Sequence, residues 1–198
     1  FHLYPTNCYV NSYRSNYAFG ECANGTKCTT NGISAKGRKG TSTFTGYTNV
    51  GTVYEPDDEF KGDLARTYFY MVTCYMNDNF TQADGGAKMF TYSGGTAQLS
   101  NYSVALLLKW HRQDPVSERE LVRNEVIYGN STYNKCNYKQ GNRNPFIDYP
   151  ELAEYIWGTK KGQTLTIASI VSAYDGGGST PIDPEKPVVK YGITFMVN

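Results

Sequence analysis

Residues 5–17 read PTNCYVNSYRSNY, a segment that has the spacing of a short helix. Pro5 suits the first turn because its fixed φ matches a helix and its missing N–H is not needed there. The apolar and polar positions fall on separate faces at three- and four-residue intervals: Val10, Tyr13 and Tyr17 on one, Asn11, Arg14 and Ser15 on the other. A helix with one buried face and one polar face can present side chains for chemistry.

The rest of the chain predicts an α+β protein that is mainly helical. Acids at residues 57–59 lie where a helix dipole favours negative charge, and Ser117 forms a capping box with Glu120. The helix from Pro56 is expected to bury Phe60, Leu64, Tyr68, Met71 and Tyr75. The other expected helices span 98–112, run from Ser117 to near Gly129, and span 150–157. Residues 20–54 are expected to form loops with short strands at Ser42–Phe44 and Thr52–Tyr54, and both 77–97 and 141–150 are expected to be loops.

The character of the sequence changes after Gly158. Residues 164–173 are β-branched and predict a strand, and residues 176–187 are rich in Gly and Pro, as a linker is. Residues 188–198 alternate like a β-strand and weakly resemble the opening strand of bacterial cell-surface repeats. We therefore expect a domain over 1–158, a strand and linker over 159–187, and the start of a β-repeat domain over 188–198.

The net charge of +1 excludes a histone-like polycation, but it does not exclude an enzyme of nucleic acids, because local patches set the field. Residues 22–54 contain no acid but carry four bases, and residues 135–143 form a second acid-free basic cluster. The 18 tyrosines fit either long ordered loops or a surface that stacks on sugars or bases. No apolar run is long enough to span a membrane.

The five cysteines cannot all pair with one another. A bridge between Cys22 and Cys28 is conceivable, and free buried thiols are the alternative. No C-x-x-C pair is present, so the spacing gives little support to a zinc site.

Three segments, in this order, resemble the endonuclease I family of periplasmic and extracellular nucleases. The first reads HLYPT over residues 2–6, continues as VNSYRSNY over 10–17, and ends with FG at 19–20. The second reads KGDLARTYFYM over 61–71. The third runs from LLKWH at 107–111 through QDPVS at 113–117 to QGNRNPFID at 140–148. The order and spacing match over roughly residues 1–158.

The resemblance implies a ββα-metal nuclease, also called a His-Me finger, in which a β-hairpin carries a catalytic His. The helix after the hairpin carries an Asn that binds the metal, and Asn11 matches that position. An amide oxygen is a hard ligand that suits Mg²⁺, with Ca²⁺ and Mn²⁺ as alternatives. Recognition centred on phosphates reads the backbone and not the bases, so we expect little sequence preference.

The sequence departs from the family pattern at its start. In the family the catalytic His and a neighbouring metal-binding acid lie upstream of the HLYPT segment, so the general base is expected upstream of Phe1. The fold is thus expected to lack its N-terminal hairpin strands, and the chain alone is expected to be inactive. His2 occupies a family position that is not the base, and His111 is expected to be structural or solvated.

Three basic residues are candidates for binding nucleic acid, each with a structural alternative. Arg14 could contact phosphate or tie its helix to the core. Lys139 and Arg143, interleaved with Tyr133 and Tyr138, could line a groove or belong to an ordinary solvated loop. The acids at 57–59 are better explained as helix-start residues than as metal ligands.

The sequence therefore predicts an Mg²⁺-dependent, sequence-tolerant endonuclease that hydrolyses DNA, RNA or both. A bacterial location is expected, secreted, at the cell surface or in the periplasm, and the protein is expected to be a monomer without a membrane span. The alternative is a non-catalytic surface module that binds nucleic acid or glycan, which the tyrosines, the basic patches and the linker would equally fit.

Overall fold

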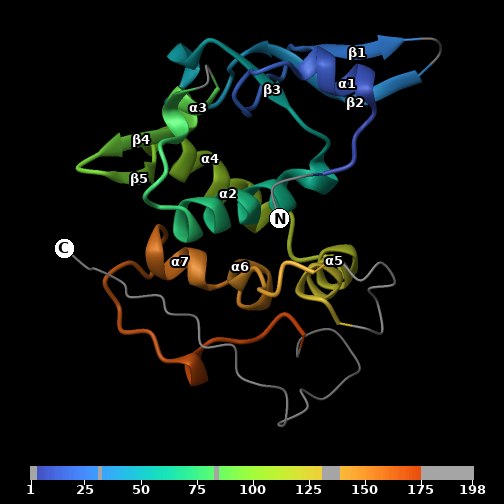
Figure 1. The fold of residues 1–198 in the computed structure, drawn as a ribbon. Coiled ribbons are helices and arrows are strands. Elements are labelled where there is room, and N and C mark those ends of the chain that lie inside the picture. Colours follow the sequence, from blue (N-terminus) through green and yellow to red (C-terminus); the bar gives the residue numbers. More distant parts are fainter. Residues whose placement is uncertain (1–3, 31–32, 83–84, 131–138, 175–198) are drawn as a thin grey trace. The chain divides into compact units, whose positions relative to one another are not determined.

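The computed structural model describes residues 4–30, 33–82, 85–130 and 139–174, and it has the α+β class expected from the sequence (Figure 1). The chain divides into two compact units, Phe1–Pro115 and Val116–Asn198. Within the described residues, the first unit contains both β-sheets and the second contains helices and turns. The domain boundaries expected at residues 158 and 187 stay predictions.

Helix α1 (Cys8–Arg14) forms where the sequence predicts a short helix, although it begins later than Pro5. The Asn7 side chain caps α1 by accepting hydrogen bonds from the backbone N–H groups of Tyr9 and Val10. Seven residues are too few to form a stable helix in water, and no residue of α1 is buried. Contacts with other elements must therefore hold α1 in place.

Three antiparallel strands follow α1 in the order β1-β2-β3: β1 (Thr26–Thr30), β2 (Ile33–Thr41) and β3 (Thr52–Glu55). The register aligns Lys27 with Arg38 and Arg38 with Glu55. These three charged residues therefore form one row across a face of the sheet.

The sequence predicted β3 but missed β1 and β2. Gly, Lys and Thr fill these two strands, and they lack the regular alternation of apolar and polar residues that marks a half-buried strand. The prediction of a strand at residues 42–44 is wrong. There the Ser42 hydroxyl accepts a hydrogen bond from the backbone N–H of Phe44, and the chain leaves the sheet.

Glu55 joins the sheet to the helix that follows it. Its side chain is buried and accepts hydrogen bonds from Lys61 Nζ at 2.8 Å and from the Cys22 backbone N–H at 2.8 Å. Arg38 Nε lies 3.2 Å from the same carboxylate. Burial by itself would raise the pKa of Glu55, but the hydrogen bonds and the two positive charges outweigh it and hold the pKa below its ordinary value.

This lowered pKa gives a pH dependence of stability. The contribution of Glu55 to the free energy of unfolding is present above its unfolded pKa of about 4.3 and is lost as the pH falls through the lower folded pKa. Thermal unfolding of the wild type and of Glu55→Gln between pH 3 and 6 measures it. We expect the gap in Tm between the two proteins to narrow as the medium becomes acidic. A gap that does not change with pH would show that Glu55 is not ionised in the network.

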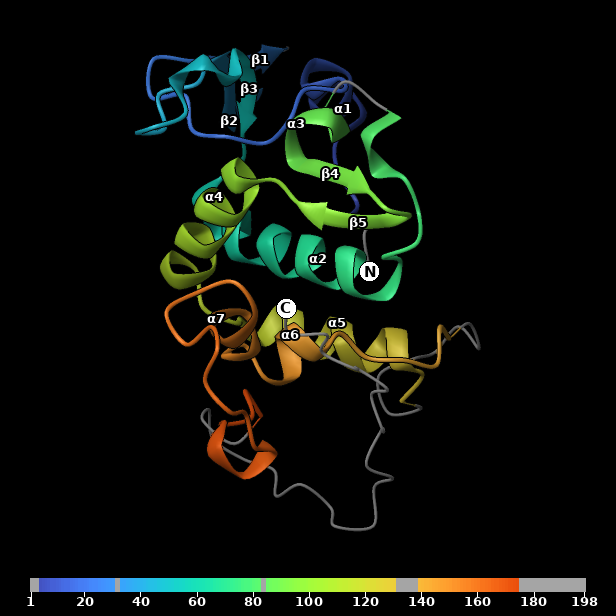
Figure 2. The ribbon, with the colours of Figure 1, turned by 90° about the vertical axis from the view of Figure 1, so that its left-hand side faces the viewer.

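Two helices and a hairpin complete the first unit. Helices α2 (Lys61–Cys74) and α4 (Asn101–Gln113) pack together, beside the hairpin of β4 (Phe90–Ser93) and β5 (Thr96–Leu99) (Figure 2). The helix expected at 98–112 is confirmed with a later start, because residue 98 belongs to β5 and Ser100 caps α4.

The hairpin corrects the expectation that residues 77–97 form a loop. Gly94 and Gly95 connect β4 to β5 with φ values of 59° and 78°. Two consecutive residues with positive φ make the tight turn that best matches the twist of a two-stranded ribbon, and Gly adopts this conformation without strain. The segment also contains the short helix α3 (Gly86–Met89).

The buried face of α2 differs from the predicted stripe. Phe60, Leu64, Tyr68 and Met71 are only half-buried and Tyr75 is 40 % exposed. The fully buried positions include Ala65, Arg66, Phe69 and Tyr70. The helix is covered by α4 and by the hairpin, so its burial does not follow the single stripe of a surface helix.

The second unit begins with α5 (Glu118–Tyr128), where both hydrogen bonds of the predicted capping box are present. Gly129 ends α5 with a φ of 103°. Helices α6 (Pro145–Asp148) and α7 (Leu152–Ile156) follow, so the expected loop at 141–150 contains one helical turn and the expected helix at 150–157 is confirmed.

The strand expected at 164–173 is wrong, because this segment holds a 3₁₀ turn at Ile167–Ser169. The Ser169 hydroxyl donates a hydrogen bond to the Thr166 carbonyl at 2.6 Å and stabilises the turn. The predicted linker at 176–187 and strand at 188–198 lie outside the described residues. In the described part of the chain, no helix has the length and apolar character needed to cross a bilayer.

Candidate active site

Asn11, the predicted metal ligand, lies on the exposed side of α1. Its backbone N–H donates to the Asn7 carbonyl and its carbonyl accepts from the Ser15 N–H, so its backbone is fully used within the helix. Among the described residues, no hydrogen bond engages its side-chain amide. The amide oxygen of Asn11 is therefore available to a ligand and is not locked in the core.

Lys39 and Tyr13 fasten α1 to the sheet. Lys39 Nζ donates a hydrogen bond to the Tyr13 carbonyl at 3.0 Å, at the C-terminal end of α1, where a positive charge also complements the helix dipole. The same Nζ lies 4.2 Å from the centroid of the Tyr13 ring. The Tyr13 hydroxyl donates to the Thr26 carbonyl of β1 at 2.9 Å. Because α1 buries no residue, these few bonds fix the helix that carries Asn11.

Replacing Lys39 with methionine should loosen α1. A hydrogen bond to a charged group and a cation–π contact are lost together, so we expect local opening of α1 to become easier by about 1–2 kcal/mol. Backbone amide exchange over residues 8–14 measures this opening and should accelerate about 5- to 30-fold. The control is Lys27→Met, which removes an exposed lysine from the neighbouring strand. Equal exchange in the two variants would rule out a specific role for Lys39.

Arg14 makes contacts within the first unit that hold α1 in place. Its guanidinium carbon lies 4.4 Å from the centroid of the Phe19 ring, and its Nε is buried without a hydrogen-bond partner among the described residues. These contacts support the alternative in which Arg14 ties α1 to the body of the unit. A contact between Arg14 and phosphate stays a prediction.

His111 is buried and held by its neighbours. Its Nδ1 lies 3.3 Å from Arg66 Nη1, and its ring packs edge-on against Phe69 with centroids 5.7 Å apart. Arg66 is itself fully buried and donates to the Asp114 carbonyl at 2.9 Å. These contacts support the structural role expected for His111. His2 lies outside the described residues.

The helix predicted from Pro56 begins later, at Lys61, and the acids at residues 57–59 lie in or next to the 3₁₀ turn at Asp58–Phe60, where they pair with lysines and do not cap α2. Asp58 lies 2.7 Å from Lys61, while Asp57 and Glu59 lie 3.1 and 3.5 Å from Lys36. In the described residues, no three His, Cys, Asp or Glu side chains gather where they could hold a metal ion. Asn11 offers one hard oxygen of the kind that Mg²⁺ accepts. A single protein ligand is compatible with Mg²⁺, because this ion typically keeps several of its waters.

Arg143 is one of the residues predicted to contact phosphate. Its guanidinium forms ion pairs with two carboxylates of its own unit. It donates to Asp148 Oδ1 from Nη2 at 2.8 Å and to Oδ2 from Nε at 2.9 Å, a bidentate pair, and to Glu125 from Nη1 at 2.7 Å. It also donates to the Tyr174 hydroxyl. Burial would lower the pKa of Arg143, but the paired carboxylates outweigh it and raise the pKa.

This network gives Arg143 a structural role that the sequence did not reveal, because its partners come together only on folding. The Arg143 side chain is 13 % exposed, and its charge is balanced by acids. Lys139 differs, since its side chain is exposed, which fits both the groove and the solvated loop expected as alternatives. Phosphate binding by either residue stays a prediction, and Tyr133, Tyr138 and Lys135 lie outside the described residues.

The cysteines that the structure describes are free. Cys22 and Cys28 are buried and do not form the conceivable bridge, while Cys8 and Cys74 are exposed. The Cys22 thiol lies 3.6 Å from the Arg38 carbonyl, and burial raises its pKa. Buried neutral thiols of this kind pack as small apolar side chains.

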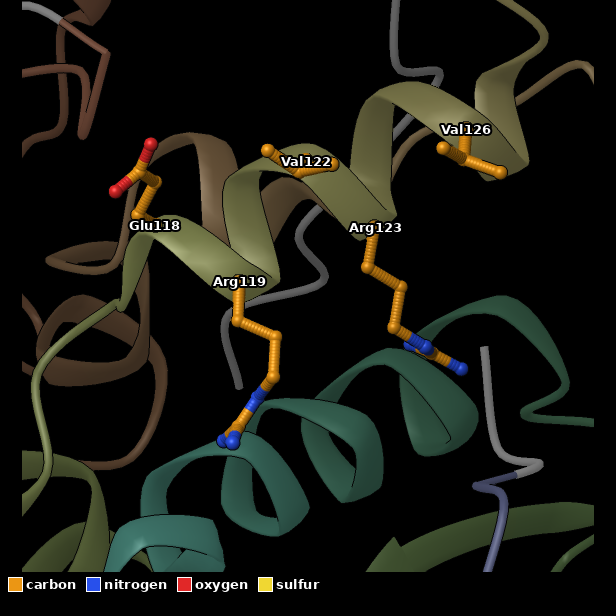
Figure 3. Close-up of a pocket in the computed structure, with 5 residues that line it drawn as sticks. All are labelled: Glu118, Arg119, Val122, Arg123 and Val126. Atoms are coloured by element: carbon orange, nitrogen blue, oxygen red, sulfur yellow. The ribbon is translucent and has the colours of Figure 1, made fainter. Parts of the chain in front are cut away.

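A shallow open hollow of about 520 Å³ lies along α5 and is lined by that helix alone. Figure 3 shows the long side chains of Arg119 and Arg123 extending in the same direction, and Val122 and Val126 along the other edge. The fifth lining residue is Glu118. The lining holds one acid and no Asn, His or Cys, so it does not compete with Asn11 as a metal site.

Comparison with known proteins identifies the family. The endonuclease I family model matches residues 1–151. An extracellular ribonuclease of Bacillus amyloliquefaciens is 38 % identical over 157 residues, which cover 79 % of this chain and 45 % of the relative. An extracellular ribonuclease of Bacillus subtilis (strain 168) is 44 % identical over 108 residues, covering 54 % of this chain and 33 % of the relative.

This chain belongs to the endonuclease I family, which confirms the resemblance carried by its three segments. It aligns with less than half of the length of either curated relative. No solved structure matches the chain.

Proposed function

We propose that the protein is a secreted endonuclease of the ββα-metal class that hydrolyses phosphodiester bonds in RNA, DNA or both, with little sequence preference. The observation that carries the proposal is the position of Asn11 within the matched family region. It places an uncommitted amide oxygen on the exposed side of a helix that specific contacts hold against a sheet. The two relatives are named extracellular ribonucleases, which supports secretion and the inclusion of RNA among the substrates.

The role of Asn11 is to hold a divalent cation, for which we propose Mg²⁺. A bound Mg²⁺ neutralises charge on the scissile phosphate and on the leaving oxygen. Lys39 and Tyr13 keep the Asn11 helix at a fixed distance from the sheet, so the ligand is positioned before substrate arrives. Recognition through phosphates then explains a weak sequence preference.

We assign no catalytic role to His111. Its imidazole is buried beside Arg66 and Phe69, and so a water that attacks phosphate at Asn11 could not pass its proton to it. The base that we propose is the family's catalytic His, which precedes the HLYPT segment and is neither His2 nor His111. This 198-residue chain alone should then cut much more slowly than the full-length protein.

Cleavage of supercoiled plasmid and of a long RNA by the full-length protein, with Mg²⁺ and then with EDTA, tests the proposal. We expect nicks and breaks at many sequences with Mg²⁺ and none with EDTA. Cleavage that survives EDTA would contradict the metal-dependent mechanism. Binding without any cleavage would favour the alternative of a surface module for nucleic acid or glycan. Equal cleavage by the 198-residue chain would place the base within it.

A further inference from the structure

Two exposed tyrosines of the first unit lie close to the group formed by Lys39 and Tyr13: Tyr17 beside Lys39, and Tyr9 one helical turn before Tyr13. Tyr9 is 47 % exposed and Tyr17 is 37 % exposed. Lys39 Nζ lies 4.2 Å from the Tyr13 ring centroid and 5.0 Å from that of Tyr17. Figure 1 shows α1, which carries Tyr9 and Tyr13, beside β1 and β2. Three aromatic rings and one ammonium group thus lie on one part of the surface.

The spacing on α1 brings Tyr9 and Tyr13 together. They are four residues apart, which places them on neighbouring turns of one face. Burial raises the pKa of the Tyr13 hydroxyl, and the nearby Tyr9 adds to the shift. Tyr13 is already used to fasten α1 through Thr26 and Lys39, whereas Tyr9 and Tyr17 present their rings to solvent.

Lys39 supplies a positive charge at the rings of Tyr13 and Tyr17. Lys39 makes its contacts with a carbonyl and with ring faces, and within the described residues it forms no ion pair with a carboxylate. It belongs to the run from Cys22 to Tyr54, which contains no acid. A ligand that combines flat rings with negative charge suits such a surface.

We propose that Tyr9, Tyr17 and Lys39 form a subsite that stacks unpaired bases of single-stranded nucleic acid, with an adjoining phosphate at Lys39. Every base has a π-face, so such stacking is tolerant of sequence, and bases within a duplex are not free to stack on a protein ring. This inference rests on the proposed function and narrows it to a preference for single-stranded substrate.

The subsite and the candidate metal ligand share α1 but lie on different faces of it. Tyr9 and Asn11 are two residues apart on α1, about 3 Å along the helix axis and about 200° around it. Residues two apart on a helix do not face each other, so Tyr9 and Asn11 point to nearly opposite sides of α1. A strand that stacks a base on Tyr9 therefore reaches Asn11 only by passing over α1.

Binding of fluorescent oligonucleotides, measured by anisotropy at low salt with EDTA, tests the subsite without requiring cleavage. The probes are a 12-mer single strand, the same strand with abasic positions, and a 12-base-pair duplex. We expect the wild type to bind the base-bearing single strand most tightly. Tyr9→Ala/Tyr17→Ala should weaken this binding at least about tenfold and leave binding of the abasic strand nearly unchanged. Tyr9→Trp/Tyr17→Trp should retain it.

The matched control is Tyr75→Ala/Tyr92→Ala, which removes two tyrosines of similar exposure, 40 % and 38 %, from the same unit. If both double variants weakened binding of the base-bearing strand equally, the subsite would be overturned. The same holds if Tyr9→Ala/Tyr17→Ala weakened binding of the abasic strand as much as binding of the base-bearing strand. So would a wild type that binds the duplex or a neutral glycan as tightly as the single strand. These outcomes are separate from the proposed function, which fails only if the full-length wild type shows no metal-dependent cleavage.

Discussion

Replacing Asn11 with alanine is expected to lower Mg²⁺-dependent cleavage by the full-length protein at least about 100-fold. Groups that merely orient a metal ligand are already worth about 10- to 100-fold, and Asn11 is proposed to touch the metal itself. The fold should not change, because the Asn11 side chain is exposed and makes no hydrogen bond among the described residues. Initial rates over a range of Mg²⁺ concentrations, together with a circular dichroism spectrum, measure both effects.

The control for this experiment is Ser12→Ala, an exposed neighbour on the same helix. It should cut like the wild type. Asn11→Asp is a second variant that keeps an oxygen ligand and adds a negative charge, and it should retain more activity than Asn11→Ala. Full activity in Asn11→Ala would remove this residue from the mechanism.

Arg143→Met is expected to lower the free energy of unfolding of the second unit by about 3–5 kcal/mol. The substitution leaves Asp148 and Glu125 buried without their shared cation, and an uncompensated buried charge is far costlier than a lost surface pair. Urea unfolding followed by fluorescence measures the loss, with Trp157 as the reporter in this unit. The hydroxyl of Tyr174 belongs to the same network, and burial raises its pKa to about 12.

Lys139→Met provides the matched comparison. Lys139 is an exposed neighbour of Arg143 in sequence, so its removal should change the stability by less than about 0.5 kcal/mol. If Arg143 instead served mainly to hold phosphate, its removal would weaken nucleic-acid binding while leaving the unit as stable as Lys139→Met. That result would contradict the structural role assigned to the network.

The sequence predicted the start and end of α5, because residues close together in the chain control both. Ser117 and Glu120 cap α5 as their spacing requires, and Gly129 ends it with a positive φ. The β4–β5 hairpin carried an equally local signal in Gly94 and Gly95, which a search for two-residue turns would have found.

Contacts between distant residues could not be predicted in this way. The sequence offered Arg143 as a groove residue or a solvated loop residue, and it did not reveal the ion pair with Glu125, which is 18 residues away and joins Arg143 only in the folded unit. The hydrogen bond from Lys39 to Tyr13, which holds α1 against the sheet, was equally hidden from the sequence. These two residues come together only when the sheet forms. The family resemblance identified Asn11 as the candidate metal ligand. The structure shows in addition that Asn11 is exposed and which contacts hold its helix.

Paramagnetic NMR with Mn²⁺ in place of Mg²⁺ tests most directly whether Asn11 binds the metal. In the ¹⁵N-labelled full-length protein, substoichiometric Mn²⁺ should broaden the amide signals of residues 8–14 most strongly, and Asn11→Ala should abolish that broadening. Broadening centred instead on the acids at residues 57–59, with the signals of α1 unchanged, would contradict the metal site and the nuclease mechanism built on it.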